Sequence, residues 1–179
     1  MARPRSVPLP SSPRHGFTLV ELLVVVALLA LLAGILLPVG LSVRRSALAT
    51  MTQARFAQYA TALEGFRQDY GYYPEFGGTL GGKSDPFYRI LSGDPTENTH
   101  NPRNIRYYSF AEEEFAADGQ LVDAFGNRNL RIAVDRDLDG TIPAGEFTGI
   151  PVEQDLHLPV ALYSVPGPDN RPPEIRSWR

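Results

Sequence analysis

The sequence predicts an α+β fold in which one long N-terminal helix packs on a small antiparallel sheet. The first 70 residues hold an apolar run followed by an amphipathic segment, both of helical length. The clearest strand-like segments are short, bounded by turn residues, and lie after residue 129. Strands that follow helices, instead of alternating with them, favour an antiparallel sheet laid against a helix.

The apolar run spans residues 22–43 and contains nothing more polar than glycine, proline and one serine. Its length matches the roughly 20 residues that cross a bilayer core as a helix. Residues 1–16 carry three arginines and no acid, and positive charge ahead of the first apolar segment keeps that end in the cytoplasm. We therefore expect a single-pass membrane helix at 17–43 and an exported domain at 44–179.

A cleaved secretory signal is the alternative for this end of the chain, because Ala47-Leu48-Ala49 offers a small-x-small cleavage site. The apolar region of a signal peptide runs about 7 to 15 residues, which is shorter than this run. Arg44 and Arg45 also lie between the run and the site. A retained anchor is therefore favoured.

Glu21 stands at the head of the apolar run. A carboxylate carried toward the membrane centre costs roughly 2.5 to 3.5 kcal/mol, so we expect a partner for it. The alternative is a side chain that reaches back to the lipid headgroups.

The N-terminal motif resembles the prepilin leader and first helix of the type IV filament superfamily. The resemblance is carried by Gly16, the run Phe17-Thr18-Leu19-Val20-Glu21 and Pro38 further along the helix. It implies that a prepilin peptidase removes the leader 1–16 between Gly16 and Phe17 and methylates the new N-terminus. It also implies that Glu21 pairs with the Phe17 amine of a neighbouring subunit in a helical filament. A charge paired in this way is tolerated in an apolar layer where a lone one is not.

The amphipathic segment continues the helix to about residue 70. Apolar side chains recur there at spacings of three and four and form one stripe: Phe56, Tyr59, Leu63, Phe66 and Tyr70. Gly71 and Pro74 end the helix. Pro38 removes one amide donor and presses on the Gly34 carbonyl, so we expect the helix to bend or unwind locally between 34 and 40.

The exported domain contains a short helix and a few strands. The helix is expected at 85–91, with Asp85 as its cap and Pro86 at its first position. Strands are expected at 130–134 and 158–163, with a third candidate at 146–152. The segment 105–110 is either a strand or the lead into the acidic turn 112–114. These elements agree with a pilin-like fold.

Three further segments resemble the major pseudopilin of type II secretion. They are Gly71-Tyr72-Tyr73-Pro74, Asp123-Ala124-Phe125-Gly126-Asn127-Arg128 and Tyr163-Ser164-Val165-Pro166-Gly167-Pro168-Asp169. The usual middle pattern is closer to Asp-Pro-Trp-Gly-Asn-Pro, so three of its positions depart here, and the family's aspartate-rich tail is shortened.

This resemblance implies a structural subunit of a secretion pseudopilus, which assembles from the bacterial inner membrane into the periplasm and helps drive folded cargo through the outer membrane. The implied partners are further copies of the chain, other pseudopilins, prepilin peptidase, an assembly ATPase with its platform protein, and membrane lipid before assembly. The alternatives are a type IV pilin for adhesion, motility or DNA uptake, and a membrane-anchored calcium-binding or sensory module that does not polymerise.

The charge balance argues against nucleic acid as the main partner. Loss of the three leader arginines leaves 14 basic residues against 20 acidic ones, a formal net charge of −6, whereas phosphate binding needs a basic stripe. The chain has no cysteine, so no disulfide stabilises the exported domain. Small domains without disulfides commonly rely on a metal or on oligomerisation.

The acidic segment 135–146 fits the calcium-loop pattern. Acids stand at positions 1, 3 and 5, glycine at 6, an aliphatic residue at 8 and glutamate at 12. The expected ligands are Asp135, Asp137, Asp139, the Thr141 carbonyl and Glu146. A strand leads into the loop where an EF-hand has a helix, and Pro143 at position 9 offers no side-chain oxygen. The alternative is a solvated acidic turn. In the resembled pseudopilins the calcium lies elsewhere, near the positions of Ser164 and Asp169, and this chain has few acids there.

The sequence indicates no catalytic site. His15, His100 and His157 are solitary, and no nucleophile motif such as G-x-S-x-G is present. We assign no phosphate-binding loop to the glycine-rich segment 77–82. We therefore expect a structural protein and not an enzyme.

Overall fold

The computed structural model describes residues 16–97, 99–146, 154–167 and 173–178, and for residues 35–41 and 146 it describes the backbone alone. In chain order its elements are α1 (Leu19–Tyr70), α2 (Pro86–Ser92), η1 (Glu112–Glu114), β1 (Leu130–Val134), η2 (Ala144–Glu146), β2 (Val160–Ser164) and β3 (Ile175–Arg176). The chain divides into two units, Met1–Val43 and Arg44–Arg179, and α1 begins in the first and ends in the second. The fold is the predicted α+β class.

The helix α1 covers 52 residues and is α-helical through Gly34 and Pro38. A bend at this place stays a prediction, because the two units are not placed relative to each other. Within the described residues, no helical stretch is both long and apolar enough to count as a candidate membrane span.

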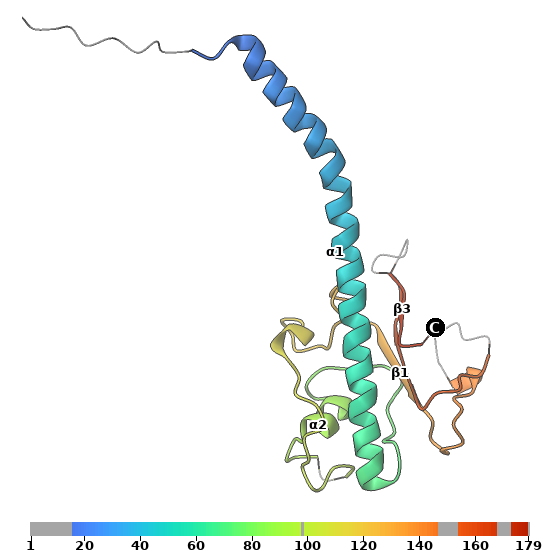
Figure 1. Ribbon diagram of the computed structural model, residues 1–179. Coiled ribbons are helices and arrows are strands. Elements are labelled where there is room, and N and C mark those ends of the chain that lie inside the picture. The colour runs from blue at the N-terminus through green and yellow to red at the C-terminus, as the bar shows by residue number, and fades with distance from the viewer. Residues whose placement is uncertain (1–15, 98, 147–153, 168–172, 179) are drawn as a thin grey trace, which may run out of the picture. The chain divides into compact units, whose positions relative to one another are not determined.

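The C-terminal part of α1 supplies the core of the second unit. Its predicted stripe is confirmed: Phe56, Tyr59, Leu63 and Phe66 are buried, and Tyr70 packs partly buried against the same cluster. The helix stops where expected, since Gly71 adopts a left-handed φ of 82° and its N–H donates to the Arg67 carbonyl at 2.7 Å. Figure 1 shows the sheet and α2 gathered around this part of α1.

The sheet has three antiparallel strands in the order β1-β2-β3. Leu130 of β1 lies opposite Ser164 of β2, and Val134 lies opposite Val160. Every residue of β2 is buried, because the sheet is covered on both faces. One face packs on α1, and the other packs on a second apolar cluster. The outer cluster contains Ile142, Ala161 and Tyr163 with Ala133, Leu156, Leu158, Val165 and Trp178 around them.

One strand prediction differs from the structure, one strand was not predicted, and one candidate is not tested. The strand expected at 158–163 is β2, shifted to Val160–Ser164. The third strand is β3, and the sequence analysis did not predict it. The candidate at 146–152 lies outside the described residues apart from Glu146, whose backbone ends η2.

The short helix α2 forms as predicted. The Asp85 carboxylate accepts the Phe87 N–H at 2.9 Å, and Pro86 occupies the first turn. The open question at 105–110 is decided against a strand. Asn101 is fully buried and binds both the N–H and the carbonyl of Ile105, so the backbone there is satisfied without a sheet partner.

Candidate functional sites

The N-terminal segment places Glu21 in the first turn of α1. Its carboxylate Oε2 accepts the Thr18 N–H and the Thr18 hydroxyl, both at 2.9 Å, and the Thr18 hydroxyl accepts the Glu21 N–H at 3.2 Å. This is a reciprocal capping box, which satisfies otherwise unpaired donors at the start of a helix. In the single chain, therefore, Glu21 caps its own helix. The sequence signal for this cap is the Thr-x-x-Glu spacing of Thr18 and Glu21.

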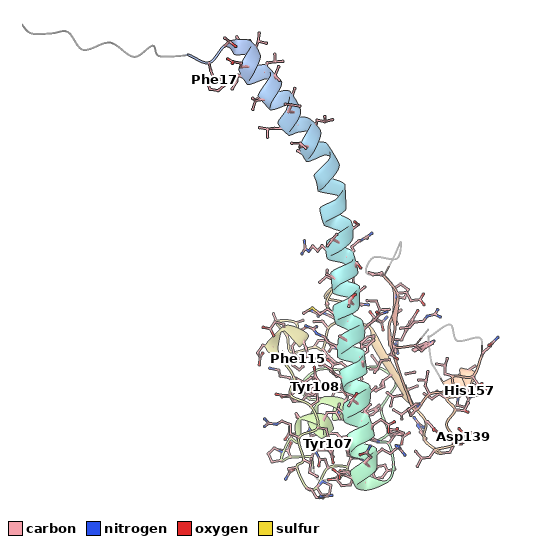
Figure 2. All side chains as sticks on the ribbon, viewed as in Figure 1. Phe17, Tyr107, Tyr108, Phe115, Asp139 and His157 are labelled. Carbon is pink, nitrogen blue, oxygen red and sulfur yellow. The ribbon has the colours of Figure 1, made fainter. Side chains whose placement is uncertain are left out.

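The apolar side chains that follow are exposed in the single chain. Phe17, at the head of the segment (Figure 2), is 81% exposed. Large apolar side chains are exposed on all sides of the helix: Leu19, Val20, Leu22, Leu23, Val24, Val25, Val26, Leu28, Leu29, Leu31 and Leu32. A helix that is apolar all round is stable only in an apolar surrounding, either lipid or other protein.

The loop after β1 brings three of the predicted metal ligands together. One carboxylate oxygen from each of Asp135, Asp137 and Asp139 lies within 4.8 Å of the other two. Asp135 is 3% exposed, whereas Asp137 and Asp139 are exposed. Glu146 has its backbone in η2, and its side chain lies outside the described residues.

The turns of this loop are formed by two residues with left-handed backbone conformation. They are also held by two hydrogen bonds from backbone N–H groups to aspartate carboxylates. Leu138 has a φ of 63° and Gly140 a φ of 87°. The Gly140 N–H donates to Asp135 Oδ2 at 2.8 Å, and the Thr141 N–H donates to Asp139 Oδ1 at 2.7 Å. The loop is thus folded back on its own carboxylates.

Beyond Thr141 the loop is tied to the segment before β2. Ile142 and Leu156 exchange backbone hydrogen bonds of 2.8 and 2.9 Å, and the Ile142 side chain is fully buried. The Thr141 hydroxyl lies 3.3 Å from His157 Nδ1. Figure 2 shows Asp139 and His157 in this same region.

A buried hydrogen-bond network joins two segments that carried the pseudopilin resemblance. Asp123 Oδ1 accepts the N–H groups of Phe125 and Asn127, each at 2.8 Å, and Asp123 Oδ2 accepts the Ser164 hydroxyl at 2.6 Å. The Asn127 side-chain amide donates to Ser164 Oγ and to the Val165 carbonyl. The Asp123 turn therefore supports the end of β2.

This network involves Ser164, one of the two residues at the calcium position of the resembled pseudopilins. The Ser164 hydroxyl is buried and already engaged with Asp123 and Asn127. Asp169 lies outside the described residues.

Two buried polar residues that no sequence pattern indicated organise this unit. Thr52 of α1 is fully buried and accepts the Ala124 N–H at 3.2 Å, which ties the Asp123 turn to the helix. Glu114 is also buried, and it accepts the hydroxyls of Tyr59 and Tyr108 and the Ala111 N–H. Burial of the two phenols and the nearby Glu114 carboxylate raise the pKa of both tyrosines above the ordinary value.

The glycine-rich segment, when two more residues are included, does carry a phosphate-loop pattern. Residues 77–84 fit the phosphate-loop pattern G-x-x-x-x-G-K-[ST], which the segment 77–82 taken alone leaves incomplete. The structure uses this segment differently. The N–H groups of Leu80 and Lys83 donate to the carbonyls of Leu130 and Gly119, and the Lys83 ammonium pairs with Glu112 at 3.2 Å. These amides are not free to bind a phosphate, so the segment is a connection along the sheet edge.

Comparisons with known proteins bear on the N-terminal segment. Residues 11–37 match the family model of the prokaryotic N-terminal methylation motif. No curated protein and no solved structure matches the chain. The matched residues include Gly16, Phe17 and Glu21 and most of the apolar run. The match supports a type IV prepilin-like, membrane-anchored protein, a class of structural filament subunits processed by prepilin peptidase.

Proposed function

We propose that this chain is a structural subunit of a type II secretion pseudopilus. It is anchored in the bacterial inner membrane, with residues 44–179 in the periplasm, and after cleavage between Gly16 and Phe17 it assembles into a helical filament that helps drive folded cargo through the outer membrane. The observation that carries the proposal is the match of residues 11–37 to the methylation motif, with that junction and Glu21 inside it.

The exposed apolar surface of α1 supports assembly. Its exposed side chains need an apolar surrounding, which is lipid before assembly and other subunits afterwards. The assembly ATPase and its platform protein supply the work of moving subunits from the first surrounding to the second. Filament formation is therefore an exchange of one apolar surrounding for another.

Glu21 provides the polar contact in this exchange. In the single chain its carboxylate is held by Thr18. In the filament the methylated Phe17 ammonium of a neighbour adds a full positive charge to the same carboxylate. Since a charge-assisted hydrogen bond is about twice as strong as a neutral one, the pair fixes the register of docking.

The contact between the Asp123 turn and Ser164 favours a pseudopilin over other prepilin-like proteins. Two of the segments that resemble the major pseudopilin lie 41 residues apart in the sequence and are joined by one buried hydrogen bond. Each resembling segment therefore has a structural partner in the other. Other pseudopilins are the expected filament neighbours.

The test is filament assembly in cells that carry Glu21→Ala. Membrane insertion should be unchanged, because alanine makes the segment more apolar, and processing should continue, whereas the filament yield should fall severely. Thr18→Ala is the matched control, since it removes the hydroxyl of the capping box and leaves the carboxylate. Normal filament yield from Glu21→Ala, or equal losses in both variants, would contradict docking through the charge.

Deletion of the gene separates this function from its alternatives. Loss of cargo secretion is expected of a pseudopilus subunit. Intact secretion with lost adhesion, motility or DNA uptake identifies a surface pilin. A chain that forms no filament on overexpression is a membrane-anchored module that does not polymerise.

A further inference from the structure

The strongest unexplained feature outside the N-terminal segment is one oxygen of Asp135. The Asp135 N–H donates to the Pro159 carbonyl at 2.9 Å, which fixes the residue at the end of β1 and next to β2. Its Oδ2 accepts the Gly140 N–H, but Oδ1 is buried and has no hydrogen-bond partner in the described part of the chain. A buried carboxylate oxygen is costly unless it is paired. This oxygen therefore points to a ligand.

The surroundings of Asp135 identify the ligand as a hard cation. The carboxylates of Asp137 and Asp139 converge on the same place as that of Asp135. Three negative charges this close repel one another, and a cation between them removes the repulsion. The donors are all oxygens, whereas zinc prefers nitrogen and sulfur ligands.

We propose that the loop 135–141 binds one Ca²⁺ through the carboxylates of Asp135, Asp137 and Asp139 and the Thr141 carbonyl. The left-handed Leu138 and Gly140 allow the short loop to wrap its oxygens around one point. Calcium is favoured over Mg²⁺ because it accepts six to eight oxygens in flexible geometry, while Mg²⁺ needs a near-ideal octahedron and keeps several waters.

The ion also holds the loop over the outer face of the sheet. Ile142 directly follows Thr141, pairs with Leu156 and is buried with Ala161 and Tyr163 of β2. Trp178, the only tryptophan of the chain, packs on this cluster with its ring centroid 6.1 Å from that of Tyr163. Trp178 fluorescence therefore reports the state of the loop.

The experiment is equilibrium dialysis of the full mature chain in detergent micelles against increasing Ca²⁺, with bound metal measured by atomic emission. We expect one Ca²⁺ per chain with a dissociation constant of about 1 mM or tighter, the weak limit for extracellular calcium modules. Asp137→Asn should weaken binding at least about tenfold. Asp137 is exposed, so this change does not disturb the core. Glu113→Gln, which removes an exposed carboxylate elsewhere, is the control and should bind as wild type does.

Three outcomes overturn the assignment: no bound ion at 1 mM Ca²⁺, equal affinity in wild type and Asp137→Asn, or tighter binding of Mg²⁺ than of Ca²⁺. A second readout tests the coupling to the sheet. Ca²⁺ at a hundredfold excess over its dissociation constant shifts the folding equilibrium about 100-fold, so the unfolding temperature should rise. Trp178 fluorescence should change with Ca²⁺ in wild type only, and an unchanged spectrum in a chain that binds the ion contradicts the coupling. The proposal does not rest on filament assembly, because every measurement uses the dispersed chain.

Discussion

Glu114 shows how a single residue organises the interior of the second unit. Its carboxylate is buried beside the T-shaped pair of Tyr59 and Tyr108, whose ring centroids lie 5.0 Å apart, and it accepts both hydroxyls. Figure 2 shows Tyr108 beside the helix that carries Tyr59. Because the phenols lie in an apolar interior next to a carboxylate, they resist ionisation. The pKa of each is raised, first by burial and then by Glu114.

This raised pKa predicts an alkaline loss of stability. In the unfolded chain the tyrosines lose their protons near the ordinary pKa of 10.0, whereas the folded chain keeps them. Above that pH the unfolded state binds fewer protons. The contribution of these tyrosines to the free energy of unfolding is therefore fully present below about pH 10 and is lost as the pH rises, by up to about 1.4 kcal/mol per pH unit for the buried Tyr59 and by less for the half-buried Tyr108. Denaturant unfolding from pH 8 to 11 measures the slope.

Tyr59→Phe removes one of these two ionisable hydroxyls. Its slope above pH 10 should therefore be shallower than that of wild type. Phe110→Leu is the control, since Phe110 packs against the rings of Tyr59 and Tyr108 but has no ionisable group, and it should keep the wild-type slope. Equal slopes in the two variants would show that Tyr59 does not contribute.

At the scale of the element, α2 shows how a helix of seven residues is held at both ends. Asp85 caps its start, and Gly93 ends it with a φ of 70°. A Cβ on Gly93 would lie 2.7 Å from the Asn104 carbonyl oxygen, so only glycine fits there. Between the ends, Phe87, Ile90 and Leu91 are buried. A helix this short is not stable alone, so packing and caps decide whether it forms.

Removal of the cap should therefore be measurable. Asp85→Ala loses the hydrogen bond from the Phe87 N–H and should lower the free energy of unfolding by about 0.5 to 2 kcal/mol. Asp85→Asn keeps an oxygen at the same place and should stay near wild type, because burial already raises the pKa of Asp85 and a neutral side chain fits the site. Denaturant midpoints provide the comparison. Equal destabilisation by alanine and asparagine would mean that the charge, and not the cap, matters.

At the scale of the whole molecule, the two units differ in what covers their apolar surface. The second unit buries its own apolar side chains between α1, α2 and the sheet. The first exposes them along the helix. This division agrees with the proposed function, in which the anchor exchanges partners while the exported domain stays folded.

The mature N-terminus tests this organisation. If the chain is a prepilin, the peptidase removes residues 1–16, and intact-mass spectrometry should find a chain that begins at N-methylated Phe17. Cells without a prepilin peptidase are the control and should retain the leader. A mature start at Thr50 would identify a secretory signal, and an uncut leader in the presence of the peptidase would contradict the prepilin interpretation.

The elements with local signals can be predicted from the amino-acid sequence. The stripe from Phe56 to Tyr70 has the helical period, Asp85 and Pro86 mark a helix start, and β1 is bounded by turn residues on both sides. The N-terminal motif is also local, and it carries the class of protein. In each case the residues that decide the structure are neighbours in the chain, so their spacing is enough to predict it.

Features that depend on residues far apart in the chain could be seen only in the folded structure. The strand β3 has two residues, too few for a period, and exists because β2 offers it an edge. Ser164 bonds to Asp123 across 41 residues, and Glu114 to Tyr59 across 55. The phosphate-loop pattern at 77–84 does not form a phosphate site, because the N–H groups of Leu80 and Lys83 donate to carbonyls elsewhere in the chain. Likewise, the spacing of Asp135, Asp137 and Asp139 was visible in the sequence, but the burial of Asp135 was not. Burial and hydrogen-bond pairing depend on which segments meet in space, and no local pattern records that.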